Sequence, residues 1–296
     1  DADFIQPSSP MEWKEKLEGL KNGMFGENKT HPDMEWEEKL KAHADSFLRD
    51  IEYLGLPDMQ EKTPDISSLA AKGSRRAAEL AERLDRIIGE AEKRIWNTDF
   101  RLLYDRKRNL FRVGFNVSAN MPDNSYYDLL ASEARLTSFI AIAKGDVPQK
   151  HWFKLGRPLL SFHGKTVLVS WNGTMFEYLM PGLVLREHPG TILRQSCILA
   201  VKRQIEYGVK KNIPWGISES GYYRFDRQLN YQYRAFGVPG LGFKSDLGKS
   251  LVIAPYATML AIPLLPRQAY KNLILLRQLE TLGNYGCYDA GDFISP

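Results

Sequence analysis

Glu219 is the acidic residue whose neighbours most strongly suggest chemistry. It lies in the segment Trp215-Gly-Ile-Ser-Glu-Ser-Gly-Tyr-Tyr223, where small residues flank the carboxylate and aromatic rings bracket it. Carbohydrate sites are commonly built in this way, because aromatic rings stack on the C–H faces of sugars while polar groups bind the hydroxyls. Trp171-Asn172 and Asn230-Tyr-Gln-Tyr233 add rings and amides of the same kind. Taken alone, the segment is explained equally well by a solvated loop glutamate.

Glu133 is the second candidate, because its position within a predicted helix places a carboxylate among apolar residues. The helix is predicted over residues 125–144, after a capping pattern at Asn124 or Ser125. At about 100° per residue, one stripe of this helix contains Leu129, Glu133, Leu136 and Ile140. Burial of an unpaired carboxylate costs free energy and raises its pKa. Glu133 is therefore either paired with an arginine or a functional acid.

Other groups have simpler interpretations. Asp128 lies away from that stripe and near Arg135, where an acid in the first turn of a helix is favoured by the helix dipole. Glu177 follows Thr174 with the spacing of a capping box, which gives its carboxylate a local structural duty. The glycine-rich loop 237–245 misses the phosphate-binding spacing and is predicted to be a turn.

Hydrophobic spacing and turn residues predict the elements that must position these side chains. Helices are predicted over residues 67–97, 125–144, 174–187, 191–211 and 267–282. Short strands are predicted at 111–117 and at 159–162 with 167–171, as hairpins at loops. No strands alternate with helices in βαβ fashion, so we expect an all-α architecture with helices paired in layers.

The composition is that of an ordinary globular protein. The 296 residues are 43% hydrophobic and 26% charged, with a net charge of +4. The basic pairs Arg75-Arg76 and Lys210-Lys211 lie in helical patterns, so solvated faces explain them better than nucleic-acid binding. The longest apolar stretch, residues 251–265, is broken by two prolines, so no membrane span is expected. The two cysteines, Cys197 and Cys287, lack the spacing of a disulfide framework or a zinc site, and neither metal nor cofactor is expected.

The chain is predicted to contain two parts, residues 1–97 and 98–296. In the first part a near-repeat, residues 11–17 and 34–40, begins shortly after a proline in each copy. Ser9-Pro10 and His31-Pro32-Asp33 are therefore predicted helix entrances. Residues 67–97 are predicted to form a long connector helix. Beyond Asp99 aromatic residues, glycines and prolines become frequent.

The second part carries a series of motifs that occur in the same order in a known family. They are residues 99–105, 115–117, 123–135, 139–146, 173–181, 215–220, 230–233, 236–242 and 254–258. Residues 98 to 293 thereby resemble the glucoamylase-like domain of cyclic β-1,2-glucan synthases. The resemblance implies an (α/α)6 toroid with short hairpins in its loops. Its cleft would cut linear β-1,2-glucan and join the cut end to the other terminus as a ring.

The same resemblance implies the site residues. The essential carboxylates fall on the Ser-Glu-Ala-Arg and Ile-Ser-Glu-Ser motifs, which are Glu133 and Glu219 here. A retaining transglycosylase needs one nucleophile and one acid/base, and we assign Glu219 as acid/base and Glu133 as nucleophile, an assignment that is reversible. Substrate contacts are expected from Tyr127, Asp128, Trp171, Trp215, Tyr222, Asn230, Tyr231, Gln232, Tyr233 and Asp289. The implied partners are β-1,2-glucan and other domains of a larger synthase, on the cytoplasmic side of a bacterial inner membrane.

Two departures from the family pattern keep alternatives open. Asp289 stands where glutamate is expected, which shortens a side chain at the cleft. The chain stops at Pro296, where the family continues with further helices, so the toroid is expected to be incomplete at its C-terminus. A non-catalytic glucan-binding module of a multidomain synthase is therefore one alternative, and a hydrolase of the endo-β-1,2-glucanase type is another.

Overall fold

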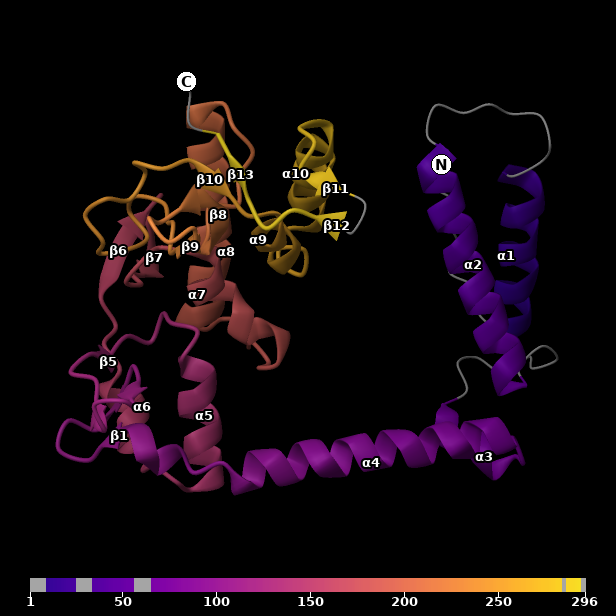
Figure 1. Cartoon of the computed structure of the whole chain (residues 1–296), viewed down its shortest axis with the longest axis horizontal. Coiled ribbons are helices and arrows are strands. Elements are labelled where there is room, and N and C mark those ends of the chain that lie inside the picture. The colour runs from indigo at the N-terminus through magenta and orange to yellow at the C-terminus, as the bar shows by residue number, and fades with distance from the viewer. Residues whose placement is uncertain (1–8, 25–33, 56–64, 284–285, 294–296) are drawn as a thin grey trace. The chain divides into compact units, whose positions relative to one another are not determined.

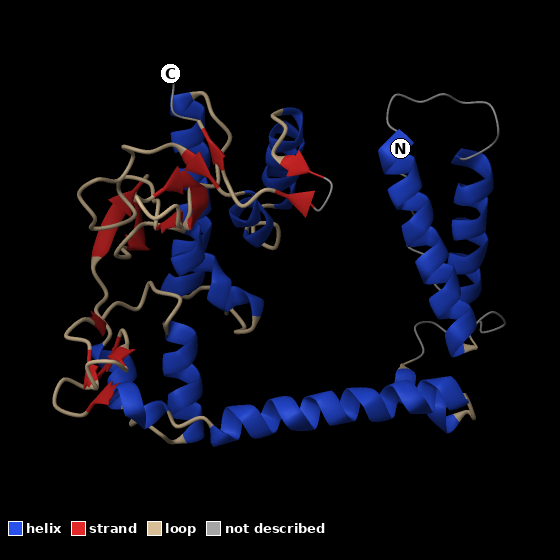
Figure 2. Cartoon of the chain, viewed as in Figure 1, coloured by secondary structure: helices blue, strands red, loops and turns tan. Residues whose placement is uncertain are grey.

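The computed structural model describes residues 9–24, 34–55, 65–283 and 286–293. Helices predominate, and short antiparallel sheets lie between them from Tyr104 onward (Figures 1 and 2). The chain divides into two compact units, residues 1–98 and 99–296. The expected mainly helical character with short β-hairpins is confirmed, and the strands lie in the second unit. No helix in the described ranges is both long and apolar enough to cross a membrane.

The first unit consists of helices. They are α1 (Pro10–Met24), α2 (Met34–Leu54), α3 (Ile66–Ala71) and α4 (Arg75–Asn97). The predicted entrance at Ser9-Pro10 is confirmed, because the Ser9 hydroxyl accepts the Glu12 backbone N–H at 3.3 Å. The second predicted entrance, at residues 31–33, lies outside the described residues.

The predicted continuous helix over 67–97 is wrong, because the backbone turns between α3 and α4. Gly73 has a φ of 93°, a left-handed conformation that glycine adopts readily. Ser74 then starts a new helix, since its hydroxyl accepts the backbone N–H of Ala77 at 3.3 Å and donates to the carbonyl of Leu54 at 3.0 Å. Leu69 and Ala77 are buried at this junction against the end of α2.

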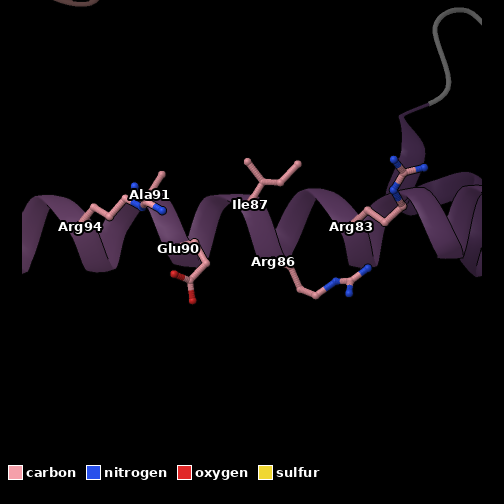
Figure 3. Close-up of a pocket in the computed structure, with 6 residues that line it drawn as sticks. All are labelled: Arg83, Arg86, Ile87, Glu90, Ala91 and Arg94. Atoms are coloured by element: carbon pink, nitrogen blue, oxygen red, sulfur yellow. The ribbon is translucent and has the colours of Figure 1, made fainter.

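Beyond this junction α4 presents a mixed apolar and basic surface. A shallow depression along it is lined by Arg83, Arg86, Ile87, Glu90, Ala91 and Arg94, all from this one helix (Figure 3). Their spacing of three and four residues places them along one side of the helix. The side chain of Ile87 is 64% exposed.

The second unit carries the remaining helices. They are η1 (Phe100–Leu103), α5 (Arg135–Lys144), α6 (Lys150–Lys154), α7 (Met175–Leu179), η2 (Met180–Leu183), α8 (Ile192–Lys211), α9 (Pro255–Leu260) and α10 (Pro266–Gln278). The helix predicted over 191–211 is confirmed as α8. The helix predicted over 174–187 ends early, at Leu179, because the chain continues as the 3-10 helix η2 with Pro181 in its first turn. The helix predicted over 267–282 ends at Gln278, and Glu280 has a left-handed φ of 57°.

Within the described residues the strands form six small sheets. Their members are β1 (Tyr104–Asp105), β2 (Leu110–Arg112) and β5 (Tyr126–Tyr127); β3 (Phe115–Asn116) and β4 (Met121–Pro122); β6 (Leu159–Phe162) and β7 (Lys165–Leu168); β8 (Ser220–Phe225) and β9 (Tyr231–Arg234); β10 (Val252–Ile253) and β13 (Gly291–Asp292); and β11 (Leu282–Gly283) and β12 (Gly286–Cys287). The predicted hairpin at 159–171 is confirmed as β6–β7. The run at 111–117 is instead split between two sheets.

The helix predicted over 125–144 starts ten residues late, at Arg135. Tyr126 and Tyr127 pair as β5 with Arg112 and Phe111 of β2. The backbone of Asp128 and Leu130 then bonds to Gly156, at 2.6 and 2.9 Å. Pairing with distant strands thus satisfies the backbone groups that a helix would have satisfied locally. The expected helical stripe, and the role of Asp128 as a first-turn acid, are wrong for this reason.

The core of the second unit surrounds α8, which packs against α7 and β7 (Figure 1). Gln204 of α8 is buried, and its amide donates to the carbonyl of Ile217 at 2.7 Å and accepts the Ile217 N–H at 2.9 Å. Asn272 of α10 pairs in the same way with the backbone of Trp215, at 2.7 and 3.1 Å. Two buried amide side chains therefore fix the backbone that leads to Glu219.

Glycines allow a close crossing of two loops beside α7. The backbone of Asn172 and Gly173 runs directly against Gly237 and Gly242. An added Cβ at Gly237 would overlap the carbonyl oxygen of Asn172. Only glycine lets the two backbones approach this closely.

We expect Gly237→Ala to destabilise the protein by about 1–3 kcal/mol, because the loop at Asn172 must move to admit a methyl group. Urea unfolding of the parent and the variant measures this difference. Gly89→Ala is the matched control, since Gly89 lies within α4 with no atom within 4 Å of an added Cβ, and there alanine is favoured by about 1 kcal/mol. Equal stability of the parent and Gly237→Ala would contradict the crossing described here.

Candidate active site

Three carboxylates from distant segments lie close enough to influence one another. Glu133 lies in the turn before α5, Glu177 in α7 and Glu219 directly before β8. Burial raises the pKa of Glu133, and the charges of Glu177 and Glu219 raise it further. Burial likewise raises the pKa of Glu219, and the charge of Glu177 adds to the effect. Two acids with raised pKa values in one place, Glu133 and Glu219, are typical of functional sites.

Arg135 fixes the turn that carries Glu133. Its guanidinium is almost completely buried and donates to the backbone carbonyls of Ser132 at 3.0 Å, Glu177 at 2.7 Å and Tyr178 at 2.6 Å. Glu187 supplies the nearest countercharge, at 3.9 Å. The arginine thus links the backbone beside Glu133 to the backbone of α7. Sequence reasoning considered an arginine partner for Glu133, but the guanidinium instead binds the neighbouring main chain.

Glu177 is held by hydrogen-bond donors of the loop before α7. Its carboxylate accepts the backbone N–H groups of Thr174 at 2.9 Å and Asn172 at 3.0 Å, and the Ser170 hydroxyl at 2.8 Å. The Thr174 hydroxyl accepts the Glu177 N–H at 3.1 Å, so the predicted capping box is confirmed. The carboxylate is buried, yet donors surround it, which lets a charge remain in the interior.

Glu219 is held by two tyrosines. Tyr233 of β9 donates its hydroxyl to the Glu219 carboxylate at 2.6 Å. Tyr256 of α9 donates to the Glu219 backbone carbonyl at 2.7 Å and contacts the Ser218 hydroxyl at 2.8 Å. The bond from Tyr233 and a side-chain bond from Thr174 both favour the ionised form of Glu219.

Tyr127 lies within electrostatic range of two of the carboxylates. Burial raises the pKa of its phenol, and the charges of Glu133 and Glu219 raise it further. Burial raises the pKa of Tyr256 as well, with added effects from the charges of Glu219 and Asp289. Both phenols therefore remain protonated at neutral pH and can donate hydrogen bonds to a bound polar molecule.

Trp171 adds an exposed aromatic surface beside Glu177. It stands between Ser170 and Asn172, which both bond to the Glu177 carboxylate. Its indole N–H donates to Asp128 at 2.7 Å, and its ring lies 5.6 Å from that of Phe243. An exposed indole with a carboxylate at its edge is the combination of stacking surface and acceptor that sugars require.

The structure separates the predicted contact residues into groups. Tyr127, Asp128, Trp171 and Tyr233 lie next to the carboxylates or the groups that hold them, as described above. Asp289 accepts the backbone N–H of Gly221 at 2.7 Å, and its charge also acts on Tyr233.

The remaining predicted contact residues have other positions. The structure corrects the prediction that Trp215 contacts substrate. Only 7% of this residue is exposed, and its ring packs in the core, where it cannot stack on a ligand. Asn230 donates to Asp226 at 3.0 Å and closes the hairpin turn. Tyr222 packs edge-on against Phe236, 5.1 Å between centroids, and Gln232 pairs opposite Tyr222. Tyr231 lies on the other face of the same hairpin.

Sequence reasoning missed several residues of this site. The sequence predicts only a capping duty for Glu177, although its charge acts on both other carboxylates. Tyr256 lies in a motif, Ala254-Pro-Tyr-Ala-Thr258, whose polar tyrosine beside a helix start was the available signal. Phe243 lies in the glycine-rich loop 237–245, for which the sequence predicts only a turn.

No group of metal-binding side chains is assembled in the part of the chain that the structure describes. Cys197 is buried and Cys287 is exposed, and both are free thiols. The site as described is therefore made of carboxylates, phenols, hydroxyls and aromatic rings.

We expect Arg135→Met to destabilise the protein by about 3–5 kcal/mol. The buried backbone carbonyls lose their hydrogen-bond donor, and Glu187 loses its countercharge. Urea unfolding measures the difference. Arg186→Met is the matched control, since Arg186 is exposed, and a surface substitution changes stability by about 0.5 kcal/mol or less. Similar losses in the two variants would show that Arg135 does not have this role.

Comparisons with known proteins place this chain. Residues 125–294 match the family described as putative glucoamylase. The chain is 50% identical over 214 residues to the cyclic β-(1,2)-glucan synthase NdvB of Rhizobium meliloti (strain 1021), covering 72% of this chain and 8% of that protein. A solved endo-β-1,2-glucanase from Chitinophaga pinensis, in complex with sophorotriose and glucose, matches with a TM-score of 0.48 and 15% identity, over 95% of this chain and 74% of that one. The family match spans more than half of the chain, and the chain therefore belongs to the putative glucoamylase family.

Proposed function

We propose that this chain is a carbohydrate-active domain that cleaves linear β-1,2-glucan and transfers the cut end within the same molecule to form a ring. The observation that carries the proposal is that Glu133 and Glu219 lie close enough for their charges to interact. Both have raised pKa values, and exposed aromatic rings lie beside them. Two carboxylates are what glycosidic bond cleavage requires. The substrate is suggested by the relative that is 50% identical over 214 residues, a cyclic β-(1,2)-glucan synthase.

The surroundings of the two acids support an exchange of the roles assigned from the sequence. Glu133 has two carboxylate neighbours that favour its protonated form, Glu177 and Glu219. Glu219 receives hydrogen bonds from the hydroxyls of Tyr233 and Thr174, which favour its ionised form. An acid must hold a proton before cleavage, while a nucleophile must be ionised. We therefore assign Glu133 as acid/base and Glu219 as nucleophile.

In this mechanism Glu219 attacks the anomeric carbon while Glu133 protonates the departing glycosidic oxygen. The covalent glycosyl-enzyme then reacts with a hydroxyl at the other end of the glucan, from which Glu133 removes the proton. Trp171 stacks on one sugar, and Asp128 at the indole edge accepts a sugar hydroxyl. Retention of anomeric configuration follows from the two displacements.

The architecture and setting are proposed on the same basis. We retain the (α/α)6 toroid as a prediction, with the helices of the second unit as its members. The chain spans 8% of the length of the synthase it matches. We therefore propose that it works beside other domains of a larger synthase, on the cytoplasmic side of a bacterial inner membrane.

Product analysis tests the reaction. We expect the protein to convert linear β-1,2-glucan into cyclic species one water lighter than the linear glucan of equal length, as measured by mass spectrometry. NMR of the first products should show retained anomeric configuration. Shortened linear glucans alone would mean hydrolysis, and binding without turnover would mean a non-catalytic module. Either result would overturn ring formation by this chain.

Leaving-group chemistry tests the roles of the two acids. Glu133→Gln should lose activity on glucan by about a hundredfold or more, but retain much of its activity on a nitrophenyl β-1,2-glucooligosaccharide, whose leaving group needs no proton. Glu219→Gln should lose activity on both substrates, because no nucleophile remains. The reverse pattern would restore the assignment made from the sequence. Glu206→Gln is the control, since Glu206 pairs with His163 on the surface.

The charge of Glu177 should be visible in the pH profile. Activity is expected to fall as pH rises through the raised pKa of Glu133, because the acid then loses its proton. Glu177→Gln removes a negative charge that contributes to this raised pKa, so the alkaline limb of kcat against pH should move to lower pH. An unmoved or oppositely shifted limb in a folded variant would contradict the coupling. Circular dichroism establishes that the variant is folded.

A further inference from the structure

The β8–β9 hairpin has two chemically different faces. Tyr231 lies directly opposite Phe225, and Tyr233 lies opposite Gly221, so these residues share one face. This outer face is exposed, with Phe225, Tyr231 and Tyr233 exposed by 48%, 55% and 65%. The inner face turns toward the core, as the contact of Tyr222 with Phe236 shows.

The rings of the outer face form a row that begins at the candidate site. Tyr233 binds the Glu219 carboxylate through its hydroxyl at 2.6 Å. Tyr231 follows two residues away on the same face of β9. Phe225 is next, with its ring centroid 5.7 Å from that of Tyr231. The row therefore leads from the nucleophile proposed above to the turn of the hairpin.

Gly221 makes room for an acceptor within this row. An added Cβ there would lie 2.7 Å from a ring carbon of Tyr231 and 2.6 Å from a carboxylate oxygen of Asp289. The same oxygen of Asp289 accepts the Gly221 N–H at 2.7 Å. Because Gly221 has no side chain, the Asp289 carboxylate and the Tyr231 ring can both lie close to it on the outer face of the hairpin. A carboxylate and an aromatic ring stand side by side on an exposed surface.

We propose that this outer face, formed by Phe225, Tyr231 and Asp289, is a distal subsite that holds glucan several sugars from the bond that is cut. The proposal rests on the proposed function. A neutral polysaccharide fits the surface, because its C–H faces stack on the rings while its hydroxyls donate to Asp289. An apolar protein segment would leave that carboxylate desolvated and unpaired. The continuity with Glu219 identifies the occupant as the same glucan chain.

The subsite should contribute to the binding of long glucan chains but not of short ones. Phe225→Ala and Tyr231→Ala should weaken binding of long linear β-1,2-glucans about 3- to 10-fold, since each removes one stacking surface. Binding of oligosaccharides too short to reach the hairpin should be unchanged. Isothermal titration calorimetry with size-fractionated glucans measures both, and KM against chain length gives a second readout. Tyr231→Phe keeps the ring and should bind long chains as the parent does.

Tyr270→Ala is the matched control, because Tyr270 is an exposed tyrosine of α10, 66% accessible. It should leave binding of every chain length unchanged. Equal weakening for short and long chains in the hairpin variants, or no weakening, would overturn the subsite. So would concentration-dependent self-association in gel filtration that Phe225→Ala abolishes, because the face would then bind a second copy.

Binding and turnover distinguish this proposal from the function on which it rests. If the parent binds long glucans through the hairpin but turns none over, the catalytic proposal fails and the subsite stands. If the parent cyclises glucan while the hairpin variants behave like it at every length, the subsite fails and the function stands. A parent that neither binds nor cleaves β-1,2-glucan overturns both.

Discussion

A carboxylate placed in the interior of a protein must be surrounded by hydrogen-bond donors, and Glu177 imposes this requirement on much of the second unit. The donors come from Ser170, Asn172 and Thr174, so the loop before α7 must curl around the carboxylate. That loop reaches its position only because Gly237 and Gly242 admit its backbone at very short range. Arg135 then links the turn that carries Glu133 to the backbone carbonyl of Glu177. The position of Glu133 therefore depends on Glu177.

The negative charges of Glu133, Glu177 and Glu219 repel one another. Like charges at close range favour protonation, and burial strengthens this effect because water no longer screens them. Tyrosine and threonine hydroxyls offset it at Glu219. Glu133 has a weaker set of donors and two acidic neighbours. Burial raises the pKa of both carboxylates, so the two acids differ in the donors and charges around them and not in the direction of the shift.

The β8–β9 hairpin joins the core to the exposed surface. Its inner face is fixed by Tyr222 against Phe236, and its outer face presents Tyr231 and Tyr233. Because side chains alternate along a strand, packing of one face determines what the other face presents. The aromatic row therefore has a defined direction with respect to Glu219, although every ring in it is exposed.

Local features were predictable because short-range interactions determine them. The capping box of Glu177, helix α8 and the β6–β7 hairpin all follow from residues within a few positions of one another. Glu219 was singled out from its neighbours in the sequence, whereas Glu133 was singled out from a helical stripe that the structure does not contain. The helix expected from residue 125 was wrong, since Tyr126 and Tyr127 pair with a strand that sequence spacing does not reveal.

The sequence by itself determined which side chains are available: the acids, the aromatic rings and the glycines. Only the tertiary structure decided which of them meet. Trp215 and Trp171 are the same residue type, yet one is packed in the core and the other is exposed beside the carboxylates. Glu177 joined the site because the backbones of distant loops cross beside it. Burial and charge proximity arise from contacts between segments far apart in the chain, and these contacts set the pKa values on which the proposed chemistry depends.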